Sequence, residues 1–155
     1  MQHSIICSEL LCLVEFYRDR ILNFNYYIFK RKLLGRLLMH FAISASWGPT
    51  DPTRAMLPFI FAASALQAND TITIMLFHDA VHLASKGVAK NILPVGPPPR
   101  FEEVYNHINA KIIVCKPCAE VRNIFKESCL EKIVFAGMND FHIASSLPNT
   151  RIITY

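Results

Sequence analysis

Short apolar runs and longer helical patterns alternate along residues 39–155 of the chain. The short runs are rich in β-branched residues and predict strands, at residues 39–45, 71–77, 110–115, 132–136 and 151–155. Between them, apolar residues recur three or four positions apart and predict helices, at residues 51–67, 78–87, 101–109, 117–125 and from 137–140 to about 147. Because strands that alternate with helices form right-handed βαβ units, we expect an α/β domain with a mainly parallel five-stranded sheet and helices on both faces.

Local signals support one domain and mark the start of its first helix. Asp51 is suited to cap a helix, and Pro52 suits the first helical position. Pro58 should kink this helix, since its ring removes one backbone hydrogen bond. The proline- and glycine-containing loop at residues 91–100 is too short to link two domains.

Residues 1–38 differ in composition from the rest of the chain. They hold six Lys/Arg and three Asp/Glu, whereas residues 39–155 hold ten and nine, so the nearly neutral body gives no reason to propose nucleic-acid binding. The first segment contains no apolar run of about 20 residues and no signal-peptide layout, so we expect no integral membrane segment. Either it is a basic amphipathic helix that docks on the domain, a partner or a membrane surface, or the functional chain begins at Met39, which we favour.

Five cysteines without an export signal indicate free thiols in a reducing compartment, for which we expect the cytoplasm. Cys129 lies alone in a predicted helix and is typical of a small buried hydrophobe. Cys115 and Cys118 form a C-x-x-C motif between a predicted strand and a predicted helix.

The carboxyl ends of parallel strands are where such sheets bind ligands and perform chemistry. That rule selects residues after each of the first four strands: Asp51, Thr53 and Arg54; His78 and Asp79; Cys115 and Cys118; Gly137 and Met138. Asp79, like Asp51, is expected to cap a helix. His78 is suited either to hydrogen-bond a sulfur group or simply to begin a helix in solvent, and Arg54 either to attract an anionic sulfur or to form a surface ion pair.

A thiolate is the reactive form of cysteine, and an ordinary thiol with a pKa of about 8.5 is mostly protonated at neutral pH. Pro117 suits a first helical position, which places Cys115 and Cys118 near unpaired N–H groups. Lys116 adds a positive charge, and the end of a strand is an accessible position. We therefore expect a lowered pKa and an accessible sulfur at Cys115.

Other chemistries have weaker signals. A structural zinc site needs four ligands, and this motif supplies two, with His107 and Cys129 the nearest further candidates. The loop at residues 46–54 matches neither a P-loop nor a dinucleotide fingerprint, and no G-x-S-x-G elbow is present. We expect no metal and no cofactor, while two inert buried thiols and a dithiol oxidoreductase remain alternatives.

Four stretches resemble the DsrE/DsrF-like family of sulfur-relay proteins, which includes TusD-like and YchN-like members: GPTDPTRAMLPFIFAASAL (48–66), ITIMLFHDAVHLASKGV (72–88), IIVCKPCAEVRNI (112–124) and IVFAGMNDF (133–141). The resemblance implies a Rossmann-like, three-layer domain and a homo-oligomer, often a trimer or hexamer. It also implies that the cysteine ending the third strand, which matches Cys115, carries a persulfide and passes sulfur to an acceptor protein. Some members share the second cysteine, but many have Arg-Gly in place of Arg122-Asn123, where Asn tolerates the left-handed turn.

The leading hypothesis is a sulfur carrier that takes sulfane sulfur from a donor protein onto Cys115 and yields it to a partner thiol. Cys118 is placed to resolve the persulfide as a disulfide. Such a carrier is of the sulfurtransferase type, and calling it an enzyme is a matter of definition. The alternatives are an oligomeric binding or assembly module with passive thiols, and a C-x-x-C dithiol oxidoreductase.

Overall fold

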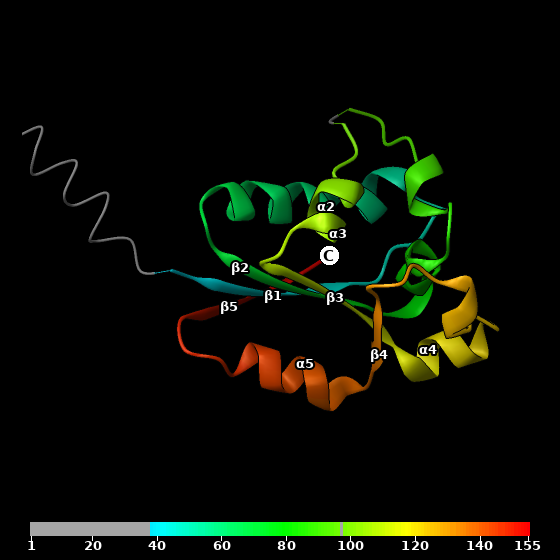
Figure 1. Cartoon of the computed structure of the whole chain (residues 1–155). Helices are drawn as coiled ribbons and strands as arrows, with labels where there is room; N and C mark the ends of the chain where they lie inside the picture. The colour runs from blue at the N-terminus through cyan, green and yellow to red at the C-terminus, as the bar shows by residue number, and fades with distance from the viewer. Residues whose placement is uncertain (1–37, 97) are drawn as a thin grey trace, which may run out of the picture. The chain divides into compact units, whose positions relative to one another are not determined.

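The computed structural model describes residues 38–96 and 98–155. The strands are β1 (His40–Ala45), β2 (Thr71–Leu76), β3 (Ala110–Cys115), β4 (Val134–Ala136) and β5 (Thr150–Thr154). They form one sheet in the order β4-β3-β2-β1-β5, in which every neighbouring pair is parallel (Figure 1). The predicted five-stranded α/β fold is confirmed, and β4 begins two residues later than expected.

The helical segments are shorter than the sequence pattern suggests. They are α2 (Pro52–Gln67), η1 (His78–Ala84), η2 (Ala89–Asn91), α3 (Phe101–Asn106), α4 (Lys116–Val121), η3 (Lys126–Ser128) and α5 (Met138–Ser145), where η marks a 3₁₀ helix. Helices α2 and α3 lie on one face of the sheet and α5 lies on the other, giving three layers (Figure 1). The predicted helix at 78–87 is thus a 3₁₀ helix ending at Ala84, and Cys129 follows η3 instead of lying in a helix.

Helix α2 begins as expected from its capping signals. The Asp51 side chain accepts a hydrogen bond from the Arg54 backbone N–H at 3.0 Å, and Pro52 is the first helical residue. The helix continues through Pro58, which is buried. Phe59 is fully buried and packs edge-on against Phe101 of α3, with ring centroids 4.8 Å apart, so α2 and α3 share one core.

The apolar core covers both faces of the central strands. Every β2 residue after Thr71 is buried, which explains the nearly continuous apolar run in a parallel strand covered on both sides. A second, smaller cluster contains Met75, Ile113 and Cys115, and Phe141 of α5 packs against it. Full burial of one such aliphatic side chain contributes about 1.5–3 kcal/mol to stability, so these strands are stabilised mainly by packing against the helices.

Within the described part of the chain, every helix is too short or too polar to cross a bilayer. The two interpretations of residues 1–38 concern a segment that, apart from Leu38, lies outside the described residues.

Candidate functional site

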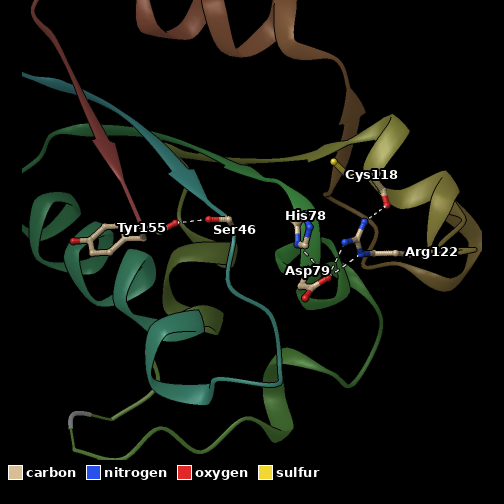
Figure 2. Close-up of polar contacts among 6 residues, drawn as sticks. All are labelled: Ser46, His78, Asp79, Cys118, Arg122 and Tyr155. Atoms are coloured by element: carbon tan, nitrogen blue, oxygen red, sulfur yellow. Dashed lines mark hydrogen bonds and ion pairs between the residues drawn. The ribbon is translucent and has the colours of Figure 1, made fainter.

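The carboxyl ends of the five parallel strands meet at one edge of the sheet, which gathers residues from distant parts of the sequence. Ser46 follows β1, His78 and Asp79 follow β2, Cys115 ends β3, and Tyr155 follows β5. The Ser46 hydroxyl donates a hydrogen bond to the Tyr155 backbone oxygen at 2.8 Å, which ties the ends of β1 and β5 together (Figure 2).

Cys115 is the last residue of β3 and the N-cap position of α4. Cys115 is only 8% exposed, and it belongs to the small cluster with Met75 and Ile113. Phe77 and Phe141, which pack against this cluster, meet edge to face with centroids 5.7 Å apart. The expectation of an accessible sulfur at Cys115 is therefore wrong, because apolar side chains from other elements, Phe141 of α5 among them, pack against the cluster that contains Cys115.

The expected lowering of the Cys115 pKa is also wrong. Burial raises the pKa of this thiol, and the Cys118 backbone N–H opposes that effect more weakly. Helix α4 has only six residues, so few aligned peptide dipoles act on the sulfur. The Lys116 ammonium lies 3.8 Å from the Glu120 carboxylate, along the exposed side of the helix, so its charge is directed to solvent.

Cys118 is the more accessible of the two thiols. It is partly exposed, and its side chain packs against both the main core cluster and the small cluster that contains Cys115. Its backbone oxygen accepts a hydrogen bond from Arg122 Nη1 at 3.2 Å. Figure 2 shows the Cys118 sulfur pointing away from Arg122, so Arg122 anchors the carbonyl and does not hold the thiol.

Arg122 connects α4 to the end of β2. Its Nε and Nη2 atoms donate to Asp79 Oδ1 at 3.0 and 2.8 Å (Figure 2). The Arg122 side chain is only 20% exposed, and its hydrogen bonds to Asp79 hold the pKa of that carboxyl below its usual range. The prediction that Asp79 caps a helix is wrong, because Phe77 occupies the N-cap position of η1 and the carboxylate turns to Arg122 instead.

Arg122 was not among the residues selected from the sequence. The available signal was its spacing of four residues from Cys118, which places both on one side of a helical turn. Its ion pair with Asp79 spans 43 positions of sequence, so only the folded chain reveals it.

Gly48 allows the loop after β1 to pack directly on the turn that carries Asp79. A Cβ atom at Gly48 would lie 2.4 Å from the Asp79 backbone oxygen. The Ala80 backbone N–H also donates to the Ser46 carbonyl at 3.2 Å. The Asp79 backbone is therefore held by the β1 loop on one side, while its carboxylate holds Arg122.

Residues 51–54 serve local structure in the described chain. Asp51 caps α2, and its carboxylate lies 3.5 Å from Arg54 Nε. The Arg54 guanidinium also stacks on Trp47, 4.4 Å from the ring centroid. The Thr53 hydroxyl accepts a hydrogen bond from the Val95 backbone N–H at 3.0 Å. The contacts of Arg54 therefore match the surface ion pair, which was one of its two predicted roles.

The other selected residues lie around the edge of the site. His78 is exposed, has a left-handed φ of 45°, and places Nδ1 3.4 Å from the Asp79 carboxylate. Gly137 begins α5 and donates its N–H to the Asp140 carboxylate at 3.2 Å. Met138 is exposed in the first turn of α5. Among residues 38–96 and 98–155, no three His, Cys, Asp or Glu side chains are grouped so that they could hold a metal ion.

Comparison with known proteins identifies the family of this chain. A family model described as the DsrE/DsrF-like family matches residues 39–153. The chain belongs to the DsrE/DsrF-like family. Proteins of this family are generally linked to sulfur relay. An uncharacterized protein of Methanopyrus kandleri is 28% identical over 98 residues, which cover 61% of this chain and 77% of that protein.

The crystal structure of the ychN protein from E. coli has a similar fold. It matches with a TM-score of 0.62 and 15% identity, covering 77% of this chain and all of that one. Where many DsrE/DsrF-like proteins were expected to have Arg-Gly, this chain has Arg122-Asn123, and Asn123 takes a left-handed φ of 54°. The prediction that asparagine preserves the turn is confirmed, and this turn ends α4 directly after Arg122.

Proposed function

We propose that this DsrE/DsrF-like chain is a sulfur carrier, in which Cys115 holds sulfane sulfur as a persulfide. The family supports a role in sulfur relay. The observation that carries the proposal is the position of Cys115 at the carboxyl end of β3, with a second free thiol, Cys118, packed against its cluster.

The chemistry is a transfer of one neutral sulfur atom between thiols. A cysteine thiolate attacks the terminal sulfur of a donor persulfide, the donor's S–S bond breaks, and the donor leaves as a thiolate. No net oxidation occurs. Because burial keeps the Cys115 thiol protonated at neutral pH, we expect its loading rate to keep rising as the pH increases past the pKa of an ordinary cysteine.

The partners of such a carrier are donor and acceptor proteins that present a persulfide and a thiol. We also propose a homo-oligomer, a trimer or hexamer, because α5, the turn after it and β5 carry exposed apolar residues, Ile143, Leu147 and Ile152. Among the described residues the three cysteines, Cys115, Cys118 and Cys129, are free thiols, which suits a reducing compartment, and we propose the cytoplasm.

Sulfur uptake tests this function directly. The reduced protein is incubated with inorganic polysulfide, desalted, and measured by mass spectrometry with peptide mapping. We expect the mass of one sulfur atom on the peptide that carries Cys115 and Cys118, lost in the double variant Cys115→Ser/Cys118→Ser. Cys129→Ser is the matched control and should load normally, since that residue is buried in the main core cluster and Cys115 belongs to the small one. Wild-type protein that takes up no sulfur contradicts the proposal.

The close packing of Cys118 against the Cys115 cluster also supports a dithiol oxidoreductase. In that case the pair would form a disulfide reversibly and gain no sulfur from polysulfide. A passive binding module would show neither reaction. The same mass measurement, repeated after a mild oxidant, separates the three functions.

A further inference from the structure

The two thiols differ in how a donor protein can reach them. Transfer between thiols requires the attacking sulfur to approach the terminal sulfur of the donor persulfide. Cys115 is 8% exposed within an apolar cluster and leaves a donor protein little room for that approach. Cys118 is partly exposed and touches the same cluster, so it lies between the protein surface and Cys115.

From this placement we propose that Cys118 is the entry thiol, which receives sulfur from the donor protein and hands it to Cys115 for storage. This inference rests on the proposed sulfur-carrier function. It assigns the two cysteines of the motif separate tasks, with Cys118 reacting at the surface and Cys115 holding the product under cover.

Both steps balance without an oxidant or reductant. In the first, the Cys118 thiolate attacks the terminal sulfur of the donor persulfide; the donor's S–S bond breaks, and the donor leaves as a thiolate. In the second, the Cys115 thiolate attacks the terminal sulfur of the Cys118 persulfide, whose S–S bond breaks and returns Cys118 as a thiolate. Each attacking thiol loses one proton, and each departing thiolate takes one up. Delivery to an acceptor is the reverse of the two steps.

The ion pair between Arg122 and Asp79 holds Cys118 for this task. Arg122 Nη1 binds the Cys118 carbonyl at 3.2 Å, and the same guanidinium binds Asp79 at 2.8 Å. The Cys118 backbone is thereby fixed relative to the end of β2, while its sulfur points away from Arg122 (Figure 2). Arg122 and Asp79 are positioning residues, since Arg122 contacts the Cys118 backbone and Asp79 holds Arg122.

Burial of the storage thiol has a chemical benefit. A persulfide on an exposed cysteine reacts with any thiol in solution, because access controls the rate of exchange. Cys115 is 8% exposed, and the aromatic residues Phe77 and Phe141 pack against its cluster, so we expect them to shield an outer sulfur carried on Cys115. An entry thiol at the surface and a covered storage thiol therefore combine rapid loading with slow loss.

Time-resolved loading of the wild-type protein tests the order of the two steps. Persulfidated serum albumin serves as a bulky protein donor, and samples are blocked at short intervals and mapped by mass spectrometry. We expect sulfur to appear first on Cys118 and later on Cys115. Sulfur that reaches Cys115 first, or both positions at one rate with no lag, overturns the inference, whereas no uptake at all by the wild type contradicts the proposed function instead.

Single variants provide a second measurement. Cys118→Ser should slow the appearance of sulfur on Cys115 from the albumin donor by about tenfold or more, because the internal transfer has been lost. The small donor inorganic polysulfide should still load Cys115 in this variant, which shows that the fold and the storage thiol are intact. Equal loading of wild type and Cys118→Ser from albumin overturns the inference.

Discussion

Replacing Gly48 with alanine tests the packing that supports the site. The alanine Cβ would lie 2.4 Å from the Asp79 backbone oxygen, 2.8 Å from its carbonyl carbon and 2.9 Å from its Cβ. Ordinary contacts of a Cβ begin at 3.4 Å, so the β1 loop and the Asp79 turn must separate by about 1 Å. The two nearest of these three atoms belong to the backbone, which cannot move aside as a flexible side chain can.

Overpacking of this kind costs about 1–3 kcal/mol. Part of that cost is offset, because alanine restricts the unfolded chain and thereby raises the free energy of unfolding by about 0.4–1 kcal/mol. We therefore expect Gly48→Ala to lower the free energy of unfolding by about 1–2 kcal/mol, and to lower Tm by roughly 3–10 °C for a domain of this size.

Urea denaturation followed by circular dichroism measures this change. Gly137→Ala is the matched control, because a Cβ there meets no atom within 4 Å and the backbone φ is −106°. The control should change the free energy of unfolding by about 0.5 kcal/mol or less, since a lost N-cap preference and a stiffer unfolded chain act in opposite directions. Equal stability of the Gly48 and Gly137 variants would refute the close approach of the β1 loop to Asp79.

Three further variants test other parts of the structure. Phe59→Ala, which removes a fully buried ring, should lower the free energy of unfolding by about 3–5 kcal/mol in urea, whereas Phe125→Ala at a 57% exposed position should cost about 0.5 kcal/mol or less. Burial lowers the pKa of His40, so the folded chain keeps this imidazole neutral, and stability should fall as the pH drops below about 6.5. His40→Gln should make the free energy of unfolding depend less on pH in this range. An unchanged slope of stability against pH would contradict the assignment of this effect to His40. Arg122→Met should free the first turn of α4 and speed alkylation of Cys118 by iodoacetamide more than Arg122→Lys does; equal rates in both variants and the wild type would contradict the anchoring role.

Much of the fold could be predicted from the sequence, because it depends on patterns within short segments. Apolar runs of strand length located all five strands, and β3 was placed at residues 110–115, as observed. The cap at Asp51 could be predicted because its side chain reaches a backbone N–H only three residues away. The left-handed backbone at Asn123 was expected from the resemblance to relatives with glycine at this position, because asparagine tolerates a positive φ better than most residues.

The bounds of the short helices were less predictable. The sequence pattern extended α4 to residue 125, but the turn at Asn123 follows directly after Arg122. The segment from His78 to Ala84 became a 3₁₀ helix, and the left-handed φ of His78 marks its start. Such endings depend on how each segment packs against its neighbours, which hydrophobic periodicity does not contain.

The sequence by itself determined the five strands, the covered core and the placement of two cysteines at the carboxyl edge of the sheet. Only the tertiary structure decided the state of those cysteines. Cys115 is buried in a small cluster with Met75 of β2 and Ile113, against which Phe141 of α5, more than twenty residues later in the chain, also packs. Arg122 meets Asp79 across 43 positions. Exposure, pKa and ion pairing depend on what surrounds a group in space, and a local pattern records only its neighbours along the chain.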